Sequence, residues 1–391
     1  MKITFLTGEY PPMQGGIADY TANLAAQLLP LGMPPTVLIS RRWRCSAEKT
    51  VPVYATLPDW GWRSWFYIRH HLKRYQPDVL HIQYQAAMYD LGGWVNWLPW
   101  YLKQRRQKTR VVTTFHDLRV PYIFPKAGRF RWRSMLALAR HSDAVICTNR
   151  EDIATLERHG IGAENPQKIH LIRLGNNVRP QPPADFERAT WRQQYQADES
   201  TLLLAYFGFL NESKGGEELI TALGVLHQQG IKAKLLFIGG EVGSADPTNV
   251  AYARRIKQLI EQNGLTSYVH RTGYVGLHEV SANLLAADAV VLPYRDGVSF
   301  RRTTLIAALR HGCPIVSTEP PQPQHLPEIQ ANQTMLLAQP HNAESLAQTI
   351  ALLADDLPLR QRLSAASTEL GNLFDWSQVG QETARLYQQL Y

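Results

Sequence analysis

The chain has 391 residues, 45% of them hydrophobic and 19% charged, so it is long enough for two or three packed domains and too apolar to be mostly disordered. The formal net charge of +8 is unevenly distributed, because residues 1–180 carry 25 Lys+Arg against 12 Asp+Glu, whereas residues 181–391 carry 16 against 21. Eight of the ten tryptophans also lie in the first part, which predicts two modules with different partners.

The start of the chain and its cysteines favour a cytoplasmic protein. The first apolar run is interrupted at Gly8 and Glu9, too early for a signal peptide, and no run approaches the roughly 18 apolar residues of a membrane-spanning helix. Cys45, Cys147 and Cys313 lie far apart, which favours isolated buried side chains over disulfides or a zinc site. We therefore expect a cytoplasmic protein, either free or bound peripherally at the inner face of the membrane.

In the first half of the chain, apolar runs of strand length alternate with amphipathic segments of helix length, a pattern typical of a parallel α/β domain. The predicted strands cover residues 3–6, 36–39, 79–82, 111–115, 144–147 and 169–172, and predicted helices cover residues 17–29 and 152–158. The proline-rich segment 179–183 then interrupts the pattern, so the first domain is expected to span residues 1–180.

The alternation restarts after this segment. Strands are predicted at residues 202–207, 234–238, 269–272, 289–292 and 315–317, and helices at 217–228, 250–262, 281–286, 303–311, 344–353 and 359–370. The amphipathic tail has no strand after it. The expected fold class is therefore α/β, with two Rossmann-like doubly wound domains, residues 1–180 and 181–374, and a closing helix at residues 375–391.

Two candidate sites lie at predicted strand ends in the first domain. The segment 8–16 joins a strand to a helix, and Gly15 and Gly16 precede that helix. Such a turn either binds an anion with backbone N–H groups or only makes a tight turn. His116 follows the strand 111–115, at the end where open parallel sheets bind ligands, so it either contacts a phosphate or sugar or caps the strand.

Basic residues follow two predicted strands of the second domain. Lys214 precedes paired glycines at a strand-to-helix turn, where it can hold a diphosphate or be a solvated loop lysine. Segment 292–304 combines Arg301 and Arg302 with Asp296 and Arg295 and ends at a helix start. Arginines suit phosphate oxygens, and Thr303 or Thr304 is expected to cap the helix.

Two aromatic and basic segments remain, residues 60–67 (WGWRSWFY) and 93–101 (GWVNWLPWY), each followed by several Lys and Arg residues. Tryptophan with basic residues is typical of contact with an anionic membrane surface. The alternative is core tryptophan beside solvated cations. No nucleic-acid-binding motif accompanies these segments, so no nucleic-acid partner is expected.

These features together resemble glycosyltransferase family 4, which comprises retaining sugar transferases with the GT-B fold. The similar segments occur in the family's order along nearly the whole chain: residues 15–25 (GGIADYTANLA), 142–146 (SDAVI), 169–175 (IHLIRLG), 207–215 (FGFLNESKG), 311–316 (HGCPIV) and 374–376 (FDW).

The resemblance implies a retaining transfer of a sugar from a nucleotide-sugar donor to an acceptor hydroxyl, with the acceptor on the first domain and the donor on the second. Gly15 and Gly16 would approach the donor phosphates, His116 would face the reacting sugar and Lys214 would hold the diphosphate. Backbone groups near Tyr274 and Val275 would meet the base. The last helix would cross back to the first domain. No cofactor or metal is expected, and a lipid-linked or polysaccharide acceptor fits the basic first domain.

The chain departs from the family pattern at three positions. The usual Arg before the Lys loop is Phe209, and the usual Glu-x7-Glu pair falls on Ser299 and Ala307. We therefore expect Arg301 or Arg302, with Thr303 and Thr304, to bind the phosphates, and Asp296 to contact a sugar or ribose.

The same departures leave other functions open. A catalytically inactive sugar-nucleotide-binding scaffold and a nucleotide-sugar epimerase of the same fold are the main alternatives. Two further alternatives are a phosphorylase and a basic adaptor protein that binds a membrane or nucleic acid.

Overall fold

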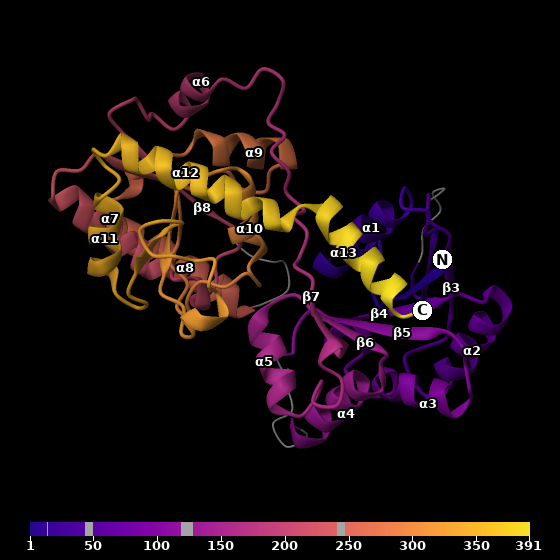
Figure 1. Cartoon of the computed structure of the whole chain (residues 1–391). Helices are drawn as coiled ribbons and strands as arrows, with labels where there is room; N and C mark the ends of the chain where they lie inside the picture. The colour runs from indigo at the N-terminus through magenta and orange to yellow at the C-terminus, as the bar shows by residue number, and fades with distance from the viewer. Residues whose placement is uncertain (14, 44–49, 119–127, 241–246) are drawn as a thin grey trace. The chain divides into compact units, whose positions relative to one another are not determined.

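The computed structural model describes all residues except 14, 44–49, 119–127 and 241–246 (Figure 1). The chain divides into two compact units. The first unit combines Met1–Gly175 with Asp375–Tyr391, and the second unit is Asn176–Phe374. Within the described ranges, no helix is long and apolar enough to cross a membrane.

The first unit is built on a seven-stranded parallel sheet in the order β3-β2-β1-β4-β5-β6-β7. Its strands are β1 (Ile3–Leu6), β2 (Pro35–Ser40), β3 (Val53–Leu57), β4 (Val79–Tyr84), β5 (Arg110–Phe115), β6 (Ala144–Cys147) and β7 (Ile169–Leu171). The central strands are buried on both faces, which explains why they read as continuous apolar runs in the sequence.

Helices cover both faces of this sheet. One face packs against α1 (Gly16–Leu28) and α13 (Trp376–Gln389), which lie against each other (Figure 1). The other face packs against α2 (Ser64–Tyr75), α3 (Leu98–Gln104), α4 (Gly128–His141) and α5 (Arg150–Arg158). The expected return of the last helix to the first domain is therefore confirmed, because α13 supplies part of this unit's core.

The second unit contains a six-stranded parallel sheet in the order β10-β9-β8-β11-β12-β13. Its strands are β8 (Leu202–Phe207), β9 (Ala233–Ile238), β10 (Val269–Arg271), β11 (Ala289–Leu292), β12 (Ile315–Thr318) and β13 (Leu336–Ala338). Its helices are α6 (Arg188–Gln193), α7 (Gly216–Gln228), α8 (Pro247–Gln262), α9 (Leu277–Ala286), α10 (Thr303–Arg310), α11 (Ala343–Ala351) and α12 (Leu357–Gly371).

The expected fold class of two Rossmann-like doubly wound domains is confirmed, and every predicted strand is present. Two strands were not predicted. Both β3 and β13 are edge strands, and β3 is only partly buried while β13 has three residues, so neither produces a long apolar run. Cys147 and Cys313 are buried, as expected, whereas Cys45 lies outside the described residues.

Candidate active site

The switch point of the second sheet lies between β8 and β11, where the connections leave in opposite directions. Doubly wound sheets bind ligands at this point, outside the carboxyl ends of the strands. The loop after β8 leads to α7 and the loop after β11 leads to α10. In these two described segments neither N-cap residue bonds its helix through a side chain, although the N–H of Glu217 in α7 donates to the hydroxyl of Tyr252 at 3.3 Å. The other first N–H groups of the two helices suit an anion.

Two glycines allow the two loops to approach each other closely. Gly215 has φ 68°, and a Cβ at this position would overlap the carbonyl oxygen of Pro293. Gly208 has φ 115°, and a Cβ there would lie 2.8 Å from Thr304 Cγ2 and 3.2 Å from Lys214 Nζ. Two predicted site residues, Lys214 and Thr304, therefore meet beside Gly208, from loops that are far apart in the sequence.

The ammonium group of Lys214 is held in place and partly desolvated. Its Nζ donates a hydrogen bond of 2.8 Å to the carbonyl oxygen of Phe209, which also accepts one of 3.3 Å from the hydroxyl of Tyr206. Burial, reinforced by the nearby charge of Arg302, lowers the pKa of Lys214 to about 8. Lys214 therefore remains mostly protonated at pH 7, at an electrostatic cost that a bound anion would relieve.

Arg302 is the second cation at this point, and three contacts orient its guanidinium. Nη2 donates to both carboxylate oxygens of Asp296, at 2.5 and 2.6 Å. The guanidinium carbon lies 4.8 Å from the ring centre of Tyr294, within cation–π range. The structure thus pairs the predicted residue Asp296 with Arg302, and it places Arg302 close enough to Lys214 to affect the pKa of that amine.

The expectation that Thr303 or Thr304 caps α10 is wrong. The N-cap position is Arg302, and α10 begins with Thr303, which is exposed. The hydroxyl of Thr304 instead shares a hydrogen bond of 2.8 Å with the hydroxyl of Tyr294. Because Tyr294 lies in the loop after β11, this bond anchors that loop to α10.

The three arginines of segment 292–304 have different surroundings. Arg295 is held by carboxylates of the α7 region, with distances of 2.7 Å to Glu218, 2.6 Å to Glu217 and 3.1 Å to Glu212. The positive charge of Arg295 is therefore balanced by carboxylates of the same unit. Arg301 is half-buried, and its backbone N–H donates to Ser299 Oγ at 3.4 Å.

The predicted base-binding residues follow β10. Tyr274 is 90% exposed, and Val275 is half-buried. The preceding turn is tied to the loop after β9, because Thr272 Oγ1 accepts a bond of 3.0 Å from the N–H of Gly239. The exposed ring of Tyr274 can thus stack on a planar ligand at the same end of the sheet as Lys214.

In the first unit, His116 lies at the carboxyl end of β5. Its Nε2 forms a hydrogen bond of 2.7 Å with Gln83 Oε1 at the end of β4, and the ring of Tyr20 from α1 meets it edge-on at 4.7 Å. Burial lowers the pKa of His116 to about 3, so the imidazole is neutral at pH 7. Sequence reasoning missed Gln83, although a fully buried glutamine in a strand is the kind of polar exception that signals a site.

Gly15 and Gly16 lie at the start of α1. The carboxylate of Glu9 lies directly against Gly15, whereas the space beside Gly16 is open. Burial raises the pKa of Glu9. The carboxyl group of Glu9 thus already lies near the start of α1. One turn further along this helix, the ring of Tyr20 contacts His116.

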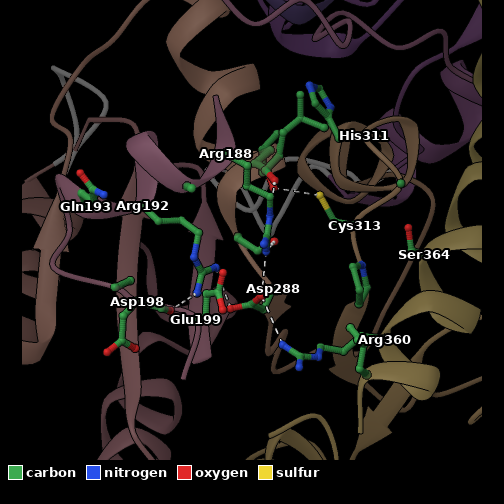
Figure 2. Close-up of a pocket in the computed structure, with 18 of the residues that line it drawn as sticks. Arg188, Arg192, Gln193, Asp198, Glu199, Asp288, His311, Cys313, Arg360 and Ser364 are labelled. Carbon is green, nitrogen blue, oxygen red and sulfur yellow. Dashed lines mark hydrogen bonds and ion pairs between the residues drawn. The ribbon is translucent and has the colours of Figure 1, made fainter. Parts of the chain in front are cut away.

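The second unit also contains a hollow of about 1120 Å³ that sequence reasoning did not find. Figure 2 shows Arg188, Arg192 and Arg360 directed at Asp288, with nitrogen–oxygen distances of 2.7, 2.8 and 3.3 Å. Asp288 precedes β11, so this hollow lies at the opposite end of the strands from Lys214. Three arginines and three acidic residues line it, and these equal numbers of opposite charges are typical of a structural ion-pair cluster.

Two family models match the chain, one on each unit. Residues 15–175 match the Glycosyl transferase 4-like domain, and residues 187–370 match Glycosyl transferases group 1. These matches confirm the resemblance that the sequence motifs indicated.

Curated relatives carry related names. WcaL of Escherichia coli (strain K12), whose name assigns it to colanic acid biosynthesis, is 29% identical over 65% of this chain. The match spans 58% of the length of WcaL. The D-inositol 3-phosphate glycosyltransferase of Corynebacterium diphtheriae is 24% identical over 81% of this chain and 71% of its own length.

Solved structures of the same fold match the chain from end to end. Sucrose-phosphate synthase from Thermosynechococcus elongatus has a TM-score of 0.76 and 21% identity, with 100% of this chain and 99% of that chain covered. Anabaena HepE in complex with UDP has a TM-score of 0.76 and 17% identity, with both chains fully covered.

Proposed function

This chain belongs to the glycosyltransferases of the GT-B fold, and on that premise we propose that it is a retaining enzyme that transfers a sugar from a nucleotide-sugar donor to an acceptor hydroxyl. Structures of the similar Anabaena HepE contain UDP and UDP-glucose, which supports a donor of this class. The acceptor we propose is a lipid-linked or polysaccharide hydroxyl, in keeping with the basic composition of residues 1–180.

The observation that carries this proposal is the pair of cations at the switch point of the second sheet. Lys214 and Arg302 lie beside the starts of α7 and α10, where neither N-cap residue makes a side-chain bond to its helix. A diphosphate needs this combination of two positive side chains and free N–H groups. Arg302 thus takes the place of the arginine that the family pattern has where this chain has Phe209, and Asp296 orients it.

The chemical step is a substitution at the anomeric carbon. The bond from this carbon to the donor phosphate oxygen breaks, and its electron pair leaves with the nucleotide diphosphate. The acceptor oxygen forms the new bond on the same face, and its proton passes to the departing phosphate oxygen. Lys214 and Arg302 stabilise the charge that develops on the diphosphate, which is the main barrier-lowering effect available to these residues.

His116 is proposed to position the transferred sugar. When Nε2–H donates to Gln83 Oε1, the lone pair of the ring lies on Nδ1, which can accept a hydrogen bond from a sugar hydroxyl. Because its pKa is about 3, His116 keeps this neutral form throughout the physiological pH range.

Calorimetric titration with nucleotide diphosphates and nucleotide sugars tests the proposal. We expect one nucleotide family to bind at micromolar strength, and Lys214→Ala and Arg302→Ala each to weaken it by about tenfold or more, because each removes a charge-assisted contact of roughly 1.5–3 kcal/mol. Arg310→Ala, at the other end of α10, is the matched control and should bind like the unaltered protein.

Analysis of the products formed from the bound donor distinguishes the alternatives. Donor binding without transfer or hydrolysis would support an inactive scaffold, and conversion of the donor's sugar to its epimer would support an epimerase. If Arg302→Ala binds the donor normally, the assignment of Arg302 as the second phosphate cation is wrong.

A further inference from the structure

Large aromatic side chains are exposed on the helical layer of the first unit formed by α2, α3 and α4. We call the following residues the aromatic face: Trp62, Phe66, Tyr67, Trp94 and Trp100, with 39–53% of each residue exposed. They come from the start of α2 and from residues 94–100, which lead through a 3₁₀ turn at Val95–Trp97 into α3. Helix α3 packs against both α2 and α4 in this layer (Figure 1).

The aromatic face is held on a fixed base. Trp65 stacks on Tyr101 with ring centres 4.9 Å apart, and its Nε1 donates a bond of 2.9 Å to the carbonyl oxygen of Trp94. Helix α2 buries Ile68 and Leu72 in the core on its other side. The core of this unit is therefore filled without the aromatic face, which also borders a hollow of about 600 Å³.

Basic residues predominate in the two segments that carry these rings, and two of them, Lys103 and Arg110, pair with Asp143 at 3.8 and 3.7 Å. Residues 60–77 contain four Lys+Arg and residues 91–116 contain five, and neither segment contains Asp or Glu. Arg63 lies over the ring of Trp62 at 5.8 Å, and Arg105 lies over Tyr101 at 5.4 Å. Within the described part of the chain, no carboxylate pairs with Arg63, Lys73 or Arg105, and all three are exposed.

This combination identifies the partner by its chemistry. Exposed tryptophans bind at the level of lipid headgroups, and unpaired cations bind lipid phosphates. Stable attachment to a bilayer usually requires two such signals. We propose that the aromatic face docks this protein on an anionic phospholipid surface. Trp62, Phe66 and Trp100 would insert between the headgroups, while Arg63 and Arg105 would bind their phosphates.

The aromatic face is connected to the acceptor side of the proposed site within the same unit. Trp60, just before α2, packs edge-on against Tyr89 with ring centres 4.7 Å apart. The hydroxyl of Tyr89 donates to the carbonyl oxygen of Gln83 at 2.7 Å, and the side chain of Gln83 bonds His116. The inference deepens the proposed function, and rests on it only in assigning the acceptor to the lipid surface.

Vesicle binding by the full chain tests the inference. We expect the protein to float with vesicles of phosphatidylcholine containing phosphatidylglycerol but not with phosphatidylcholine alone, and brominated lipids to quench its tryptophan fluorescence. Trp62→Ala with Trp100→Ala, and separately Arg63→Glu with Arg105→Glu, should each lower the partition coefficient by about tenfold or more. A circular dichroism melt shows whether each variant is folded.

Matched controls lie on the second unit. Arg254→Glu with Lys257→Glu makes the same change in net charge from exposed positions on α8, and Leu352→Ala with Leu357→Ala removes exposed apolar side chains. Both controls should bind vesicles like the unaltered protein. Equal loss in the charge control would show a general charge effect and overturn the proposal.

Three further results would overturn it: absence of binding to anionic vesicles, quenching of the tryptophans by a soluble oligosaccharide in place of lipid, and self-association through this face in sedimentation velocity. Titration of a soluble nucleotide sugar without vesicles separates the two proposals. If a variant no longer binds vesicles but keeps normal donor affinity, the result supports the docking surface and does not test the donor site.

Discussion

Lys214 combines two properties that oppose each other. It lies where a diphosphate is proposed to bind, yet burial and the charge of Arg302 lower the pKa of its amine to about 8. A bound diphosphate would supply the negative charge that the free site lacks, and so would raise this pKa again. Donor binding and protonation of Lys214 should therefore be linked.

The linkage predicts a pH dependence of donor affinity. Lys214 is cationic below its pKa and neutral above it, so the dissociation constant of a nucleotide sugar should increase as the pH rises from 7 through 8 to 9.5. Isothermal calorimetry across this range measures the effect. Lys214→Arg keeps its charge at all these pH values and should give a flat profile. An unchanged slope in this variant would assign the dependence to another group.

The residue types in segment 292–304 do not by themselves show which of its arginines faces the proposed phosphate site. The sequence indicates a cluster of phosphate-binding cations, but the structure engages Arg295 with three glutamates and directs Arg302 to Asp296 beside Lys214. This division depends on the glutamates of α7, which are more than 70 residues away in the chain. No local pattern in the segment distinguishes one arginine from the other.

At the scale of elements, α13 belongs to the first unit although it ends the chain. Its Tyr387 is fully buried and its hydroxyl forms a hydrogen bond of 2.5 Å with Nδ1 of His81 in β4. The other ring nitrogen of His81 bonds Thr114 of β5 at 2.7 Å. Burial, with a smaller effect of His116, lowers the pKa of His81 to about 3, so this link between helix and sheet is neutral.

Removing the hydroxyl of Tyr387 should weaken the attachment of α13. In Tyr387→Phe a buried nitrogen of His81 loses its partner, which costs about 1–3 kcal/mol of the free energy of unfolding. Urea titration followed by circular dichroism measures this change. Tyr391→Phe is the control, because the hydroxyl of Tyr391 bonds the carbonyl oxygen of Asp78 at an exposed position and its loss should cost little. Equal losses in both variants would contradict the structural role of His81.

At the scale of the whole molecule, the two units differ in how the chain builds them. The second unit is one continuous segment with its own core, whereas the first needs α13 from the far end of the chain. The proposed donor site lies in the second unit and the proposed lipid-docking surface in the first. The two binding functions should therefore be separable.

We predict that a fragment of residues 176–374 folds alone and binds the nucleotide without binding vesicles. Its core is complete without the rest of the chain, which is the condition for independent folding. Cooperative thermal unfolding and calorimetry with the nucleotide check the first part, and vesicle flotation checks the second. A fragment of residues 1–175 lacks α13 and should unfold at a lower temperature than the first unit does in the full chain. Vesicle binding by the 176–374 fragment would place the docking surface elsewhere.

Most of the fold could be predicted from the sequence because its central strands are buried on both faces and its helices are amphipathic, so each produces a local pattern. The loops that follow β5, β8 and β11 could be identified as candidate sites for the same reason. The edge strands β3 and β13 could not, since they are short or half-exposed. The roles of the site residues stay predictions until the variants are measured.

The sequence by itself determined two doubly wound domains, their order along the chain and the residue types at the strand ends, because these follow from periodicity over a few residues. Only the tertiary structure decided that Arg302 lies beside Lys214, that Gln83 holds His116 and that Trp62, Trp94 and Trp100 are exposed. Each of these depends on contacts between segments that are far apart in the chain, where close packing determines which side chains meet.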